Sequence, residues 1–149
     1  MLVTNHVLSG AVIGHLMPNA PVAFGIGVLS HLVLDAVPHW GEPGPIEEML
    51  HVAVPDGLVG ATAMAVVTLA TNPGRRPRVL AGMAGAAFLD ADKPSRLFFG
   101  FSPFPRVIDH IHERVQRESP HRLPQEVLVG TVGALVVAAL TRWRRAASA

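Results

Sequence analysis

The stretch "GVLSHLVLDAVPHWG", residues Gly27–Gly41, places two histidines and an aspartate in an otherwise apolar run. His31 and Asp35 are four residues apart, so on a helix their side chains lie on one face. Pro38 disfavours helical conformation at the residue before it, so we expect the helix to end there and His39 to follow in the exit turn. Such groups are costly to bury unless they are paired or bind a metal. The stretch therefore predicts a polar site at the end of an apolar helix.

The composition around this stretch favours a membrane protein. The chain has 149 residues, enough for one domain, and is 50% hydrophobic but only 15% charged, with a mean hydropathy of +0.39. An average soluble domain is about 25% charged. The net charge of +1 gives no basic field for nucleic acid, and without cysteine there is no disulfide or thiolate metal site.

Five apolar segments set the expected architecture. A full membrane span needs about 20 apolar residues, whereas runs of about 10–14 are more often buried core helices or re-entrant segments. Several segments are short, so a soluble helical protein is the alternative. We expect an all-α integral membrane bundle of four to five short transmembrane helices and one amphipathic helix, forming a single domain over residues 1–149. The segments are Leu2–Met17, Ala20–Val37, Val52–Thr71, Val79–Leu89 and Val127–Thr141.

Charge is sorted between the two ends of such a bundle. If all five segments cross the membrane, one side receives residues 18–21, 72–78 and 142–149, which carry six arginines and no carboxylate. The other side receives all eleven Asp and Glu and the remaining six Lys and Arg. The positive-inside rule accounts for this sorting and places the arginine-rich loop and the C-terminus in the cytoplasm. The acidic side then faces outward.

Two further features fit a bilayer. Trp40 and Trp143 fall just past the ends of two segments, where interfacial aromatic residues collect. Small residues recur at intervals that let helices approach closely. Chance in an Ala/Gly-rich sequence is the alternative for these pairs, which are Gly10 and Gly14, Gly57 and Ala61, and Ala81 and Gly85.

The long connection from Asp90 to Glu126 is polar and punctuated by proline. Its stretch "RLFFGFSPFPR", residues 96–106, holds four phenylalanines and predicts an irregular loop at the membrane interface. This loop either anchors the protein or caps a lipid-binding cleft. The following apolar residues recur every four positions from Val107, which predicts a short amphipathic helix. Ser119–Pro120 would end that helix.

More histidines and acids gather at the outward-facing end. His6 opens the first segment, and Asp90 and Asp92 end the fourth. His110 and His112 lie in the amphipathic helix, where positions two apart do not face together, so only one of them is expected to point inward. Imidazole and carboxylate groups together suit Zn, with Fe or Mn as alternatives. We predict metal ligands and general bases from this set: His6, His31, Asp35, His39 and His110 as ligands, and Asp90 and Asp92 as catalytic carboxylates.

A catalytic metal site keeps about three protein ligands and an open position for a water whose pKa the metal lowers. Glu48 and His51 have the E-x-x-H spacing of bundle metal ligands, but a glutamate-rich amphipathic turn explains them equally. Other chemistries find less support, because the sequence has no G-x-S-x-G elbow of a serine hydrolase, no phosphate-binding loop and no complete G-x-G-x-x-G motif.

The motifs resemble a known family. "TNHVLSGAVIG" and "GVLSHLVLDAVPHWG" are similar to the T-H-x-x-x-G-like and G-x-x-S-H-x-x-x-D elements of the bacterial inner-membrane family of membrane-bound metal-dependent hydrolases. Thr4, His6 and Gly10 match the first element, and His31 and Asp35 stand in the second. The stretch "DHIHERVQRES" is similar to a histidine–glutamine stretch in small relatives. Larger members carry P-D-x-D-H and H-R-x-x-T-H elements, which this sequence lacks.

The resemblance implies a metal-dependent hydrolase in the bacterial inner membrane. Together with the membrane placement, it predicts membrane lipid as a partner and a phosphoester or lipid as a substrate class. The alternative is a non-enzymatic membrane protein whose His/Asp cluster binds metal, handles protons or stabilises the fold. A transporter would carry polar groups to the opposite side of the bilayer, where only His15 lies.

Overall fold

The computed structural model describes residues 1–42, 44 and 46–147. Within this part, seven α-helices form, and the β-type pairing is a single isolated bridge between His39 and Glu118. The all-α prediction is therefore confirmed. The helices are α1 (Val3–Leu16), α2 (Ala20–Ala36), α3 (Ile46–Ala70), α4 (Arg76–Ala87), α5 (Asp92–Phe99), α6 (Arg106–Val115) and α7 (Leu123–Ala146), with short 3-10 turns η1 (Pro73–Arg75), η2 (Leu89–Ala91) and η3 (Pro120–Arg122).

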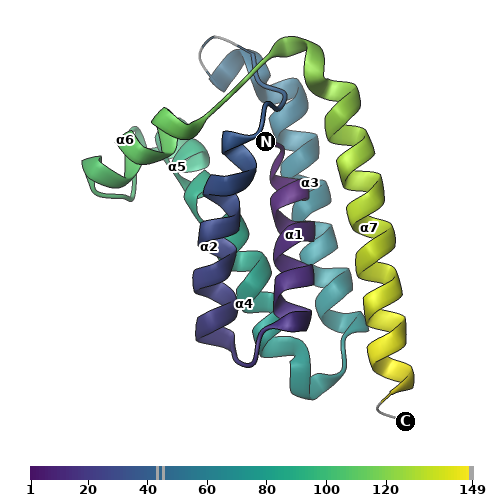
Figure 1. Ribbon diagram of the computed structural model, residues 1–149. Coiled ribbons are helices and arrows are strands. Elements are labelled where there is room, and N and C mark those ends of the chain that lie inside the picture. Colours follow the sequence, from purple (N-terminus) through teal and green to yellow (C-terminus); the bar gives the residue numbers. More distant parts are fainter. Residues whose placement is uncertain (43, 45, 148–149) are drawn as a thin grey trace.

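Helix α1 lies in the middle of the bundle and packs against four others. Helices α2 and α4 lie on one side of it, and α3 and α7 lie on the other (Figure 1). Helices α5 and α6 project from the end where α1 begins, whereas the C-terminus of α7 lies at the opposite end (Figure 1). A small apolar core joins α1, α4 and α7, formed by Val7, Leu8, Ala11, Val79, Met83 and Val137.

Glycines bring the inner helices into backbone contact. A Cβ on Gly82 of α4 would overlap the carbonyl oxygen of Gly10 in α1, and a Cβ on Gly85 would overlap the carbonyl of Phe24 in α2. The expected role of Gly10 and Gly85 in close packing is confirmed. The prediction was wrong for Gly57, because a Cβ there would meet no atom within 4 Å.

Many polar and charged side chains are buried in this protein, beside its small apolar core. The largest fully buried side chains include four histidines, one aspartate and one glutamate, whereas many large apolar side chains on α2, α3 and α7 are exposed. Exposed apolar surface of this extent marks a membrane or protein interaction site. Interior polar groups with an apolar exterior are typical of helices in lipid.

Two helical stretches, Glu47–Ala70 and Pro120–Ala146, are long and apolar enough to cross a membrane. A bundle of four to five such spans is not found among the described residues. At 1.5 Å per residue, α1 and α4 reach only about 20 Å, against about 30 Å for the hydrocarbon core. These two inner helices are covered by their neighbours, so they do not need a span of apolar surface.

The connection after α4 is more ordered than the sequence predicted. Its first part, expected to be irregular, is helical as far as Phe99, and Gly100 ends α5 in the left-handed conformation with φ 77°. Helix α6 ends at Val115, before the expected Ser119–Pro120 stop. The reason is that residues 116–119 turn extended and pair with the exit of α2, where Arg117 N donates to Asp35 O at 3.1 Å. Helix α2 ends at Ala36, as Pro38 predicted.

Candidate metal centre

Two carboxylates hold the start of α1 at the end of the bundle that carries the histidines. Asp56 of α3 accepts the backbone N–H groups of Val3 at 2.7 Å and Thr4 at 3.2 Å. Glu126 of α7 accepts the backbone N–H of Leu2 at 3.0 Å. The first N–H groups of a helix have no partner within the helix, so these acids both satisfy them and complement the helix dipole. His6, in the first turns of α1, is thereby fixed in place.

Asp35 is the centre of the polar cluster. Its Oδ1 lies 3.1 Å from His6 Nε2, and its Oδ2 lies 3.0 Å from His31 Nε2 and 3.3 Å from His112 Nε2. Gln116 Nε2 donates to Oδ2 at 2.8 Å. The side chains come from α1, α2, α6 and the residue after α6, and Asp35 and His31 are 0% exposed. Three segments, namely α1, α2 and α6 with the residue that follows it, thus converge on one buried carboxylate.

The hydrogen bond made by His31 Nδ1 determines whether His31 Nε2 carries a hydrogen or a free lone pair. His31 Nδ1 lies 2.7 Å from the carbonyl oxygen of Ala86, which only accepts, so Nδ1 carries the hydrogen. In the neutral ring, Nε2 then presents a lone pair. That lone pair faces Asp35 Oδ2 and lies 3.0 Å from His112 Nε2. These acceptors need a donor or a cation between them. The N–H of His112 or the amide of Gln116 can supply the donor, and a metal ion would take its place. The N-terminal ammonium of Met1, 2.8 Å from Asp35 Oδ1, already offsets the charge of the carboxylate.

A second group of possible ligands adjoins the first. Atoms of His6, His31 and Asp90 lie within 4.8 Å of one another, as do those of His31, Asp35 and His112. The rings of His6 and His31 stack with centroids 3.9 Å apart. His6 Nδ1 is buried and has no hydrogen-bond partner in the described part of the chain. His31 belongs to both groups, which places it between two possible metal positions.

Lys93 sets the electrostatics of the neighbouring acids. Its Nζ lies 2.7 Å from Asp90 Oδ1. Burial alone would raise the pKa of Asp90, but Lys93, His6 and His31 outweigh burial and lower that pKa to about 2. Asp92 differs, because burial is its strongest influence and raises its pKa. Asp92 Oδ1 also has no hydrogen-bond partner among the described residues. The two acids predicted as catalytic therefore occupy unlike environments.

The remaining predicted ligands lie outside the two groups. His39 is 0% exposed, but its Nε2 lies 3.0 Å from Gln116 Oε1, so it orients the amide that donates to Asp35. His110 lies on the exposed face of α6, and His112 enters the cluster in its place. Glu48 and His51 are exposed on α3.

Sequence reasoning did not select two members of the cluster. His112 and Gln116 are four residues apart, like His31 and Asp35, and this repeated spacing is the signal that could have identified them. The carbonyl of Ala86 and the ammonium of Lys93 carry no such signal. Both become relevant only through contacts between distant segments.

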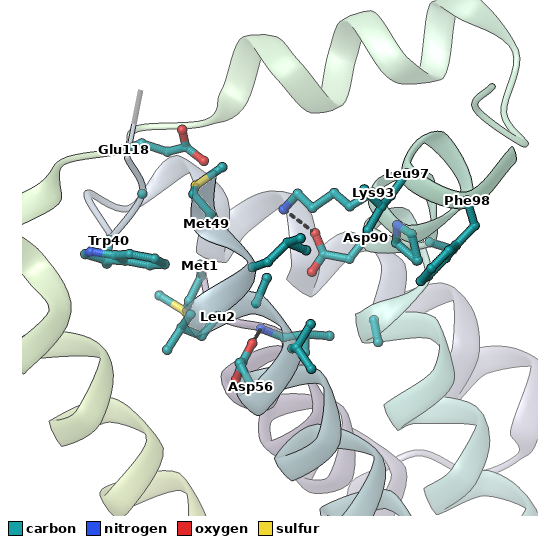
Figure 2. A pocket seen from close by; sticks show the side chains of 18 residues that line it. Met1, Leu2, Trp40, Met49, Asp56, Asp90, Lys93, Leu97, Phe98 and Glu118 are labelled. Atoms are coloured by element: carbon teal, nitrogen blue, oxygen red, sulfur yellow. Dashed lines mark hydrogen bonds and ion pairs between the residues drawn. The ribbon is translucent and has the colours of Figure 1, made fainter. Parts of the chain in front are cut away.

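A cavity of about 450 Å³ lies beside the cluster, between α3 and α5 (Figure 2). Asp90 and Lys93 line its wall, and Asp90 also belongs to the second ligand group. The cavity therefore adjoins the polar cluster. Most of the lining is apolar, including Met49, Leu50, Val54, Pro94, Leu97 and Phe98.

No family model, curated protein or solved structure matches this chain. The resemblance drawn from the sequence motifs stays a prediction.

Proposed function

We propose that this protein is a membrane-bound, metal-dependent hydrolase that acts on an amphiphilic phosphoester or lipid. The observation that carries the proposal is the convergence of His31 Nε2, His112 Nε2 and Asp35 Oδ2, separated by 3.0, 3.0 and 3.3 Å. Ligand atoms about 2.0–2.2 Å from a common metal ion lie about 3.0–3.5 Å apart. These three residues are the ligands we propose, and Zn is the metal that such a set suits best, with Fe or Mn as alternatives.

The surroundings of the ligands support a metal. A ligating histidine usually donates its other ring N–H to a carbonyl or carboxylate, and His31 makes this contact with Ala86. Gln116 holds Asp35 and is itself oriented by His39. A divalent metal bound here would lower the pKa of a water and supply hydroxide for hydrolysis near neutral pH. Asp90, beside His6 and paired with Lys93, lies between the cluster and the cavity, and its lowered pKa keeps it a fixed negative charge there.

The cavity supports an amphiphile as the substrate. Its walls on α3 and α5 are apolar, while Asp90 and Lys93 mark the side that meets the cluster. An acyl chain suits the apolar walls, and an anionic ester group suits the Lys93 ammonium. The exposed phenylalanines of α5, Phe98 at 74% and Phe99 at 72%, fit a position at the membrane interface. We place the protein in the bacterial inner membrane with the arginine-rich end in the cytoplasm.

Two neighbouring histidines provide a matched test of metal binding. His112→Ala removes a proposed ligand, whereas His110→Ala removes an exposed imidazole from the same helix. The protein is purified in detergent, loaded with Zn²⁺ and dialysed, and bound metal is measured by mass spectrometry. Losing a group that contacts the metal site typically costs at least 10–100-fold in affinity, so His112→Ala should lose its zinc while His110→Ala keeps it. A wild-type protein that retains no stoichiometric metal under these conditions refutes the proposal.

The second candidate function is a structural or proton-handling cluster without catalysis. It is favoured by the hydrogen bonds that already surround Asp35, including the one donated by Gln116. On this view, His112→Ala lowers the unfolding temperature and leaves metal content unchanged at zero. Hydrolysis of micellar phosphoesters and carboxylic esters by the zinc-loaded protein, lost in His112→Ala, would decide for the enzyme.

A further inference from the structure

The end of the bundle opposite the histidine cluster is rich in positive charge. Six arginines lie in the α3–α4 connection, the start of α4 and the end of α7, and the sequence has no Asp or Glu over residues 1–34, 57–89 or 127–149. The structure brings these segments together, because Arg78 donates to the carbonyls of Met17 and Pro18 and Asn72 donates to the carbonyl of Arg144. The arginine cluster consists of Arg75, Arg76, Arg78, Arg142 and Arg145, and Arg144 lies beside it.

Backbone contacts hold two of these guanidinium groups in place. Arg76 donates to the carbonyl oxygens of Thr71 at 3.0 Å and Leu69 at 3.2 Å, at the end of α3. Arg78 donates to the α1–α2 turn at 3.3 and 3.4 Å. Carbonyl groups at helix ends accept these hydrogen bonds but supply only partial charges. The two guanidinium groups are therefore positioned in advance, and no carboxylate in the described part of the chain pairs with them.

The arginines also act on one another. Partial burial, followed by the positive charges of Arg78 and Arg144, lowers the pKa of Arg75. His15 lies beneath this end of the bundle, 1% exposed, and its Nδ1 has no hydrogen-bond partner in the described part of the chain. Bringing like charges together is unfavourable. An external anion would relieve the repulsion.

We propose that the arginine cluster binds the phosphate group of an anionic phospholipid in the leaflet at this end of the bundle. In the described part of the chain, the stretches Glu47–Ala70 and Pro120–Ala146 are long and apolar enough to cross a membrane. The arginines follow the first stretch and lie at the end of the second. Lipid headgroups lie at the ends of such helices, and basic residues just beyond a span attract anionic lipids. The proposal rests on membrane insertion and is independent of metal binding or hydrolysis.

Trp143 provides a local probe of this site. It is 59% exposed, and the Arg144 guanidinium lies 4.6 Å from its ring centroid. In a Trp40→Phe background, quenching of its fluorescence by brominated phosphatidylglycerol is compared with quenching by brominated phosphatidylcholine in mixed micelles. We expect phosphatidylglycerol to quench at a lower mole fraction, and the preference to weaken as salt is raised.

Three arginines can be changed without removing a bond within the protein. Arg75, Arg142 and Arg145 make no side-chain hydrogen bond or ion pair with other described residues. Each basic residue near an anionic surface is worth about 1 kcal/mol, or about fivefold in affinity. The triple Arg→Gln variant should therefore lose on the order of 100-fold of the preference. Each single variant should lose about fivefold, which provides a second measurement if the triple variant does not fold.

The matched control makes the same change of charge at the opposite end. Arg106, Arg114 and Arg117 are exposed there, and their triple Arg→Gln variant should keep the preference. Equal quenching by the two lipids, an equal loss in the control, or a preference that survives all the arginine changes would overturn the proposal. Full competition by inorganic phosphate at the concentration of the lipid would instead assign the site to a soluble anion and overturn the lipid assignment.

Discussion

Gly82→Ala tests whether the contact between α1 and α4 holds the bundle together. The added Cβ would overlap the carbonyl oxygen of Gly10 and lie 2.9 Å from the backbone nitrogen of Gly14. Both obstacles are backbone atoms, which cannot rotate away, so α1 and α4 must separate by about 1 Å. Overpacking of this kind costs about 1–3 kcal/mol. The backbone clash places this case near the upper end, at about 2–3 kcal/mol.

Helix propensity opposes this cost and has to be measured separately. Alanine in place of glycine inside a helix stabilises by about 1 kcal/mol, so the net loss in Gly82→Ala is about 1–2 kcal/mol. Gly25→Ala in α2 is the control, because a Cβ at Gly25 would meet nothing within 4 Å. That variant should be stabilised by up to about 1 kcal/mol. The difference between the variants isolates the overpacking cost.

Thermal unfolding in detergent, followed by helical circular dichroism, measures the difference. At about 2–4 °C per kcal/mol for a chain of this size, Gly82→Ala should unfold about 5–10 °C below Gly25→Ala. An unfolding temperature of Gly82→Ala equal to that of Gly25→Ala would refute the reasoning, because it would mean that the helices are not in backbone contact.

Three further changes test the environment of the site. Lys93→Gln should raise the pKa of Asp90 from about 2 toward its ordinary value. Because the folded-state pKa of Asp90 is depressed, the ionised acid stabilises the protein above the unfolded-state pKa, and this stability is lost as pH falls through about 2. In an acid titration of chelator-treated protein, the Lys93→Gln variant should therefore begin to unfold at a higher pH than the wild type. Glu126→Gln should cost about 1–3 kcal/mol, measured by thermal unfolding, because the glutamate accepts backbone N–H groups of Leu2 and Trp40 with its two oxygens and an amide replaces one acceptor with a donor. Leu97→Glu places a charge in the apolar wall of the cavity and should raise KM for an acyl substrate while bound zinc is unchanged; a lower zinc content would show that the cavity and the metal site are not separate.

Some features of this protein follow from local sequence alone. The four-residue spacing of His31 and Asp35 places them on one face of any helix, and Pro38 ends that helix whatever lies around it. The order of apolar segments and charges also places the arginines at one end, and the contacts of Arg78 with the α1–α2 turn agree. These inferences need only the geometry of the helix and the cost of placing charge in an apolar environment.

Tertiary structure decided which groups share the site. The sequence predicted that only one of His110 and His112 points inward, and His110 was selected as the ligand. The orientation of α6 against α2 places His112 in the cluster instead. The early end of α6, which lets Gln116 reach Asp35, depends on pairing with the exit of α2. Tertiary structure also decided how many helices are long enough to span a membrane, because α1 is short and is shielded by its four neighbours. Contacts between residues 55 to 124 positions apart leave no periodic pattern in the sequence, so the partners are determined only when the helices pack.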